Sequence, residues 1–180
     1  MSLIVSALVN AKHKGKKEII YFLRGHDLEI RLATLNDIEP ICQLNHEFWI
    51  YNAKLQPEYY KEATESGEYP KSVIAGEDSD IFLAVENDVA MGLIHVREGQ
   101  TPPYAPIVQH TYVEIVDLIV SALYRRNGIG SKLLDAAKEW GMGRNLDYIE
   151  LLVLSDARGE VSFYKQYGFD TVSHTMRYTL

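Results

Sequence analysis

The segment from residue 111 to residue 140 restricts the possible folds most, because a strand runs into a glycine-containing turn and the turn opens a helix. Residues 111–120 are mostly β-branched, aromatic or apolar, which favours a strand. After the turn, Ile129, Leu133 and Trp140 recur at helical spacing and predict a helix with one apolar face. Such a unit requires a sheet with a helix packed against it.

The turn itself has the composition of an anion-binding site. Gly128 and Gly130 allow the backbone to approach a ligand closely, and the first N–H groups of a helix have no intrahelical acceptor. Arg125 and Arg126 add positive charge that can pair with phosphate oxygens. The pattern indicates a pyrophosphate site, and an ordinary glycine turn with surface arginines is the competing interpretation.

Two common nucleotide motifs do not match this turn. A dinucleotide-binding fingerprint needs a third glycine where Leu133 stands. A nucleotide P-loop ends in Gly-Lys-Ser/Thr, whereas this chain has the order Gly130, Ser131, Lys132. Both motifs are therefore excluded.

The remaining pattern predicts one domain in which helices and strands mix. A strand at 28–32 precedes a helix that Thr34 or Asn36 caps, and a second short helix is expected after Pro57. Further along we expect a hairpin (81–85 and 89–96), a loop (99–109), a strand (148–154), a short helix ending at Gly168 and a final strand (172–178). Because strands and helices do not alternate strictly, the fold class is α/β of the α+β type, built around one sheet.

Composition limits the function classes. A chain of 180 residues with 47% hydrophobic residues fits one compact domain. The net charge of −7 disfavours a nucleic-acid-binding surface and favours cationic small molecules. No apolar run reaches the roughly 18 residues of a membrane span, and Cys42, the only cysteine, allows no internal disulfide. We therefore expect a soluble cytoplasmic protein without a nucleic-acid or membrane partner.

The first 26 residues differ from the rest. Residues 12–17 form a Lys-rich run, which we interpret as a solvated patch. The apolar run at 19–23 is expected to form either an extra edge strand or part of a disordered extension. The apolar leader at 2–9 has no basic region before it and is expected to stay uncleaved. These features divide the chain into an extension, 1–26, and a main domain, 27–180.

Two segments resemble the signatures of the GNAT superfamily of N-acetyltransferases. Residues 125–130, Arg-Arg-Asn-Gly-Ile-Gly, are similar to the family's Arg/Gln-x-x-Gly-x-Gly/Ala acetyl-CoA loop. Residues 163–169 are similar to its Tyr-x-x-x-Gly-Phe signature, at the expected separation. The resemblance implies a mixed, mostly antiparallel sheet flanked by helices, with fourth and fifth strands that splay apart to admit the pantetheine arm. It implies acetyl-CoA as the acetyl donor and no metal.

The resemblance also implies where acetyl-CoA binds. In the family, loop amides hold the pyrophosphate, and backbone groups at the end of the fourth strand pair with pantetheine. The corresponding positions in this chain are Leu118, Ile119, Val120, Arg125, Arg126, Asn127, Gly128, Ile129, Gly130 and Ser131. One departure concerns a pantetheine-binding asparagine of many family members. This chain has Ala157 there, and Ser155 or Asp156 are the candidates to replace the asparagine.

Acetyl transfer to an amine needs a base, because an amine with a pKa near 10.4 is almost fully protonated at pH 7. Glu114 is the first candidate, since a carboxylate on an apolar strand face should have a raised pKa and some family members carry a catalytic glutamate there. The alternatives are Asp117, a water chain, or a Glu114 that is only a solvent-exposed residue. Asp117 would point to the opposite face of the strand unless a bulge intervenes.

Tyr164 matches the tyrosine that acts as general acid in the family. A tyrosine has a higher pKa than a thiol, so Tyr164 must be acidified or act mainly as a hydrogen-bond donor to the leaving thiolate. The expected function is acetyl-CoA-dependent N-acetyl transfer to a primary amine of a small molecule or peptide, by direct attack in a ternary complex. The rival expectation is a non-catalytic acyl-CoA-binding or sensory module. A homodimer is common in the resembling family, and the sequence does not identify the acceptor.

Overall fold

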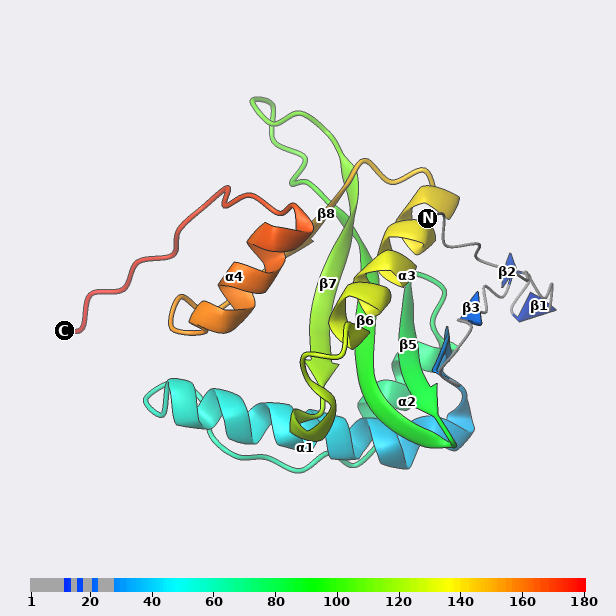
Figure 1. Cartoon of the computed structure of the whole chain (residues 1–180). Coiled ribbons are helices and arrows are strands. Elements are labelled where there is room, and N and C mark those ends of the chain that lie inside the picture. The colour runs from blue at the N-terminus through cyan, green and yellow to red at the C-terminus, as the bar shows by residue number, and fades with distance from the viewer. Residues whose placement is uncertain (1–11, 14–15, 18–20, 23–27) are drawn as a thin grey trace.

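The computed structural model describes residues 12–13, 16–17, 21–22 and 28–180. Within these residues, six strands form one sheet in the order β3-β4-β5-β6-β7-β8 (Figure 1). Neighbouring strands are antiparallel except β7 and β8, which run parallel. The strands are β3 (Tyr21–Phe22), β4 (Glu29–Leu32), β5 (Ser79–Glu86), β6 (Val89–Gln100), β7 (Thr111–Val120) and β8 (Tyr148–Leu151). The predicted mixed, mostly antiparallel sheet is therefore confirmed.

Only short pieces of the extension 1–26 fall within the described residues. Strand β1 (Lys12–His13) pairs with β2 (Lys16–Lys17) in a separate two-stranded sheet. Tyr21–Phe22 pairs with the start of β4 as an edge strand of the main sheet. The leader 2–9 and the rest of the predicted Lys-rich and apolar runs lie outside the described residues.

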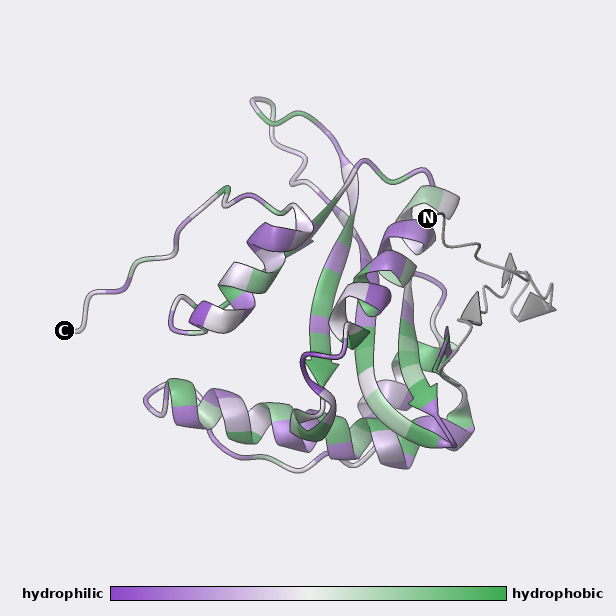
Figure 2. Ribbon diagram, in the orientation of Figure 1, coloured by the Kyte–Doolittle hydropathy of each residue, from purple (hydrophilic) through white to green (hydrophobic). Residues whose placement is uncertain are grey.

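Helices cover both faces of the sheet (Figure 1). The first two, α1 (Ile38–Leu55) and α2 (Glu68–Ala75), pack on one face over a core that contains Ile41 and Leu83. Helix α3 (Ile129–Gly143) packs on the other face over a core around Leu133. Figure 2 shows the apolar residues of β5 and β6 between these layers. No helix in the described part of the chain is long and apolar enough to cross a membrane.

Helix α4 (Arg158–Tyr167) follows β8 and lies beside the sheet rather than over its centre (Figure 1). Its aromatic residues Phe163, Tyr164 and Tyr167 pack against the core under α3. The helix ends where Gly168 adopts a left-handed conformation, as the sequence predicted. The short 3-10 turns η1 (Leu35–Asp37) and η2 (Ala122–Tyr124) precede α1 and α3.

The two halves of β7 have different neighbours. Residues 111–115, the paired half, lie between β6 and β8, and the parallel ladder with β8 ends at Ile115. Residues 116–120, the open half, pair with β6 only. Val116 is an extra residue at the boundary, because His95 pairs with Asp117 while Val96 pairs with Ile115. The predicted splay between these strands is present, and a β-bulge marks where it begins.

Three predicted elements differ from the structure. Pro57–Tyr59 form a turn rather than a helix, and the second helix begins only at Glu68. Strand β8 ends at Leu151 rather than at residue 154. The final strand predicted at 172–178 is wrong, since residues 168–180 contain neither helix nor strand and Val172 is 82% exposed. Alternating apolar residues form a strand only where a neighbouring edge supplies hydrogen bonds, and this segment extends away from the sheet (Figure 1).

Candidate active site

The glycine turn forms an open end at the start of α3. Gly128 is the N-cap residue with φ of 76°, a conformation that costs glycine little, and a Cβ built there would meet nothing within 4 Å. Arg126 is also left-handed, with φ of 66°, and is exposed. The backbone at Gly128 is therefore open to a ligand, as a pyrophosphate would need, whereas a Cβ at Gly130 would meet the Phe163 ring of α4 at 3.1 Å. The residues fit that group.

Arg125 is oriented by the protein rather than toward this open end. Its Nε donates to the backbone carbonyl of Val120 at 3.0 Å, and its guanidinium lies 5.2 Å from the ring centre of Tyr51 on α1. The Arg125 side chain thereby contacts both the end of β7 and helix α1. Positive charge for a phosphate consequently comes from Arg126 and the helix N-terminus more than from Arg125.

The open half of β7 presents backbone groups next to this turn. Ile119 is buried in the core under α1 and α2, whereas Leu118 and Val120 pack against the core under α3. Since β8 stops pairing at Ile115, no strand among the described residues pairs with the backbone of the open half on that side. Polar backbone groups at such an edge can bind an extended ligand as if it were an added strand.

The bulge brings the two candidate carboxylates of β7 to the same face. Without it, Glu114 and Asp117 would point to opposite faces, but the extra residue Val116 reverses the alternation between them. Glu114 lies in the paired half, and its Oε2 accepts hydrogen bonds from Arg97 Nη2 at 2.6 Å and Nε at 3.0 Å. Its side chain is 37% exposed. Glu114 is thus committed to an ion pair at the closed end of the splay.

Asp117 lies in the open half and in a different environment. Burial, and secondarily the charge of Glu65, raise the pKa of Asp117 to about 6. Its Oδ2 is 4.0 Å from Nδ1 of His95, which is 3% exposed and also lies 3.4 Å from the Tyr69 hydroxyl. Burial, and then the charge of Arg97, lower the pKa of His95 to about 4, so the imidazole is neutral near pH 7 and makes no ion pair with Asp117.

Tyr164 approaches the same region from α4. Burial, and then the charges of Glu160 and Asp117, raise the pKa of Tyr164 to about 12. Its ring packs edge-on against Phe169 and next to Phe163. The phenol is therefore not acidified, and it is suited to donate a hydrogen bond rather than to give up its proton.

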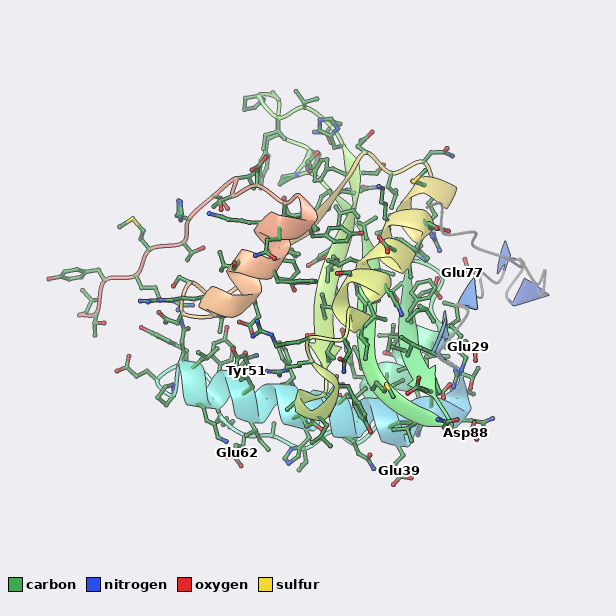
Figure 3. All side chains as sticks on the ribbon, in the orientation of Figure 1. Glu29, Glu39, Tyr51, Glu62, Glu77 and Asp88 are labelled. Carbon is green, nitrogen blue, oxygen red and sulfur yellow. The ribbon has the colours of Figure 1, made fainter. Side chains whose placement is uncertain are left out.

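Helix α1 contributes contacts that the sequence analysis missed. The hydroxyl of Tyr51, whose side chain is labelled in Figure 3, donates to Glu160 Oε1 at 2.8 Å. Gln56, the residue after the helix, donates to Asp156 at 2.9 Å. Glu47 accepts a hydrogen bond from the Ser121 hydroxyl just after β7. No local signal marks these residues, because their partners lie 74 to 109 positions away.

The loop before α4 departs from the family pattern as expected. Ala157 is 5% exposed and is the N-cap residue without a side-chain cap. Ser155 and Asp156, the two candidates for the missing asparagine, are both exposed. Asp156 accepts the hydrogen bond from Gln56 and so helps to join α1 to this loop. In the described part of the chain, no three His, Cys, Asp or Glu side chains gather as a metal site.

Comparison with known proteins identifies the family of this chain. Residues 39–169 match the model of the acetyltransferase (GNAT) family. An "Uncharacterized N-acetyltransferase MJ1207" from Methanocaldococcus jannaschii is 26% identical over 141 residues, which cover 78% of this chain and 60% of that protein. The match thus spans less than two thirds of that relative's length.

Solved structures agree in fold. A single-site mutant of the BH1408 protein from Bacillus halodurans superposes with a TM-score of 0.80 at 25% identity, over 84% of this chain and 98% of that one. The aminoglycoside acetyltransferase AAC(6')-Iy, solved with a CoA-linked bisubstrate analogue, gives a TM-score of 0.66 at 14% identity, over 85% and 97%. The matched family model covers both the glycine turn and the Tyr164 helix, and this chain belongs to the acetyltransferase (GNAT) family.

Proposed function

We propose that the protein is an acetyl-CoA-dependent N-acetyltransferase that acts on a primary amine by direct attack in a ternary complex. The observation that carries this proposal is the junction of three parts: the open helix end at Gly128, the open half of β7, and Tyr164 on α4. The first suits a pyrophosphate, the second an extended pantetheine arm, and the third a leaving sulfur. Family membership supports the same chemistry.

Each of these three parts of the site has a separate role in this proposal. Amides from Arg126 to Ser131 would hold the pyrophosphate, and backbone groups of Leu118, Ile119 and Val120 would pair with pantetheine. Bound acetyl-CoA supplies the thioester carbonyl and the thiol leaving group. Tyr164, with its raised pKa, would stabilise the departing thiolate by hydrogen bonding.

The acceptor is proposed to be a small-molecule amine that carries positive charge. The net charge of −7 and the carboxylates Asp117 and Glu65 on and beside one face of the site support a cationic ligand. The aminoglycoside acetyltransferase of similar fold, solved with a bisubstrate analogue, is an example of an enzyme with such an acceptor. A peptide amine is the second class to test, and cytoplasmic acetyl-CoA would supply the donor.

The test is release of CoA thiol from acetyl-CoA with a panel of aminoglycosides, polyamines, amino acids and peptides. Gly128→Asp should weaken acetyl-CoA binding more than tenfold relative to Gly128→Asn. The two variants share the left-handed strain, and only the aspartate repels phosphate. Tyr164→Phe should lower kcat with little change in acetyl-CoA affinity. Tight acetyl-CoA binding without thiol release on any amine would instead indicate a non-catalytic acyl-CoA-binding module.

A further inference from the structure

The open half of β7 contains one carboxylate whose surroundings differ from those of the other candidate base on the strand. We infer that Asp117, and not Glu114, accepts the proton from an amine that arrives as an ammonium ion, with Glu65 as the second carboxylate of the acceptor subsite. This inference rests on the proposed function and deepens it. Three observations carry it: the position of Asp117, the groups around it, and the contrast with Glu114.

Position is the first argument. Asp117 is adjacent in the chain to Leu118, Ile119 and Val120, the residues proposed to pair with pantetheine, and it follows the bulge where β8 turns away. Its charge acts on Tyr164, so the two side chains share one electrostatic environment. A base at this place would meet the attacking nitrogen close to the thioester, whereas Glu114 sits between strands at the closed end.

The neighbours of Asp117 leave its basicity intact. His95 and Tyr69 are both uncharged near pH 7, since burial holds the pKa of the imidazole low and that of the phenol high. The carboxylate therefore faces a neutral wall from β6 and α2, and a second carboxylate, Glu65, from the connection between α1 and α2. Asp117 remains 24% exposed at its side chain, so a substrate can reach it.

His95 has a positioning role in this arrangement. Its side chain is buried, and its Nε2 lacks a hydrogen-bond partner among the described residues. Its Nδ1 lies 3.4 Å from the Tyr69 hydroxyl and 4.0 Å from Oδ2 of Asp117. The neutral ring thus lies next to Asp117 without supplying a cation that would lower the carboxyl pKa.

Glu114 lacks these properties. Two charge-assisted hydrogen bonds from one guanidinium hold one of its oxygens, and Arg97 is itself half exposed. The oxygen that would accept a proton from an amine is therefore already engaged by Arg97. The ion pair instead joins residues that lie directly opposite each other on β6 and β7.

Glu65 indicates the class of acceptor. Its Oε2 accepts a hydrogen bond from the amide of Asn45, which is 8% exposed, so the side chain is held by α1. After burial, the negative charge of Glu65 is the second cause that raises the pKa of Asp117, by repulsion between the two carboxylates. An ammonium ion between them would relieve that repulsion, and this favours alkylamines with a high pKa over weakly basic aromatic amines.

The proton balance is complete with these groups. The ammonium gives one proton to Asp117, the neutral nitrogen attacks the thioester carbon, the C–N bond forms and the C–S bond breaks. The second nitrogen proton goes to the leaving thiolate, so the products are the amide, CoA thiol and protonated Asp117. Asp117 then returns its proton to solvent, which its exposure allows.

The test compares Asp117→Asn with Glu114→Gln on an alkylamine acceptor, from pH 5 to pH 10. Asp117→Asn should lower kcat/KM at pH 7 by at least about 100-fold and abolish the acidic limb of the profile near pH 6. The deficit should shrink toward pH 10, where the ammonium ion loses its proton to solvent without help from the enzyme. Glu114→Gln should stay within about threefold of wild type, and both variants should bind acetyl-CoA normally.

The contrary outcomes separate the base assignment from the proposed function. An Asp117→Asn enzyme within threefold of wild type, or one with the same deficit at every pH, would overturn the base role while N-acetyl transfer still stood. A wild-type enzyme that transfers acetyl to no amine would overturn the function first and this inference with it. If Asp117→Asn misfolds, the measurement is rescue of Asp117→Ala by added formate. Recovery supports the base, and no recovery with intact acetyl-CoA binding contradicts it.

Discussion

The two halves of β7 carry similar carboxylates but place them in opposite situations. In the paired half, Tyr112 stacks on Tyr148 of β8 with ring centres 5.0 Å apart, and Glu114 is bound by Arg97. In the open half, β8 no longer lies beside Asp117, whose surroundings consist of uncharged groups and another acid. A neighbouring strand and a nearby cation thus accompany the carboxylate that forms an ion pair, whereas among the described residues both are missing at Asp117, the carboxylate that we propose as the base.

The largest expected effect on the free energy of unfolding comes from substitution of two glycines of β6, one opposite each half of β7. A Cβ on Gly92 would lie 2.6 Å from the backbone oxygen of Ile119, which cannot rotate away. A Cβ on Gly99 would meet the Tyr112 ring at 2.6 Å, and a ring can shift. Gly92→Ala should cost about 3 kcal/mol of unfolding free energy and Gly99→Ala about 1 kcal/mol. Urea titrations measure both, and equal losses would contradict the claim that the open half has the more rigid backbone contact.

The next effect concerns Asp117 and stability. Because its pKa is raised from 3.8 to about 6 in the folded state, the folded protein binds more protons than the unfolded one in that interval, and stability falls as pH rises through it. Asp117→Asn removes this loss, so the variant should be more stable than wild type by about 2 kcal/mol at pH 8 and equally stable below about pH 4. Thermal unfolding across pH measures the difference. A variant destabilised at pH 8 would mean that Asp117 has a stabilising partner.

A smaller effect on the free energy of unfolding is expected at the side-chain contact between α1 and α4. Tyr51→Phe removes the hydrogen bond to Glu160 and should cost about 1 kcal/mol. Tyr104→Phe, at a 65% exposed loop position, is the matched control and should cost nothing measurable. Chemical denaturation compares the two variants. Identical curves would show that the α1–α4 contact does not contribute to the stability of the fold.

The smallest effect belongs to the ion pair of the paired half. Arg97 and Glu114 are 50% and 37% exposed at their side chains, so solvent screens their attraction. Glu114→Gln should cost no more than about 0.5 kcal/mol, and the difference should vanish in roughly 1 M salt because screening is then nearly complete. Unfolding at two salt concentrations decides this, and a salt-independent loss would show that Glu114 is held by more than charge.

Local pattern was sufficient to predict much of the fold. The spacing of Ile129, Leu133 and Trp140 located α3, and residue composition located β7 with its observed ends. The hairpin between β5 and β6 followed from Asn87 and Asp88, which both adopt the left-handed conformation that such a turn needs. These features depend on neighbours in sequence, so a single chain contains the information.

The site was predicted only in part, because its decisive features are non-local. The bulge at Val116 depends on the register with β6, and this bulge brings Glu114 and Asp117 to the same face of the strand. The partners of Asp117 come from β6, α2 and the connection before it, and Tyr51 contacts a residue 109 positions away. The predicted strand at 172–178 failed for a related reason, since alternation does not specify an available edge.

The unpartnered side of the open half has a consequence for amide hydrogen exchange. Backbone N–H groups that point to that side have no carbonyl of β8 to protect them, so their hydrogens should exchange with solvent faster than those of residues 111–115 in the ligand-free protein. An extended molecule that occupies the edge would slow exchange there, residue by residue. Deuterium uptake along β7 would then report how far into the splay a ligand reaches, without any need for turnover.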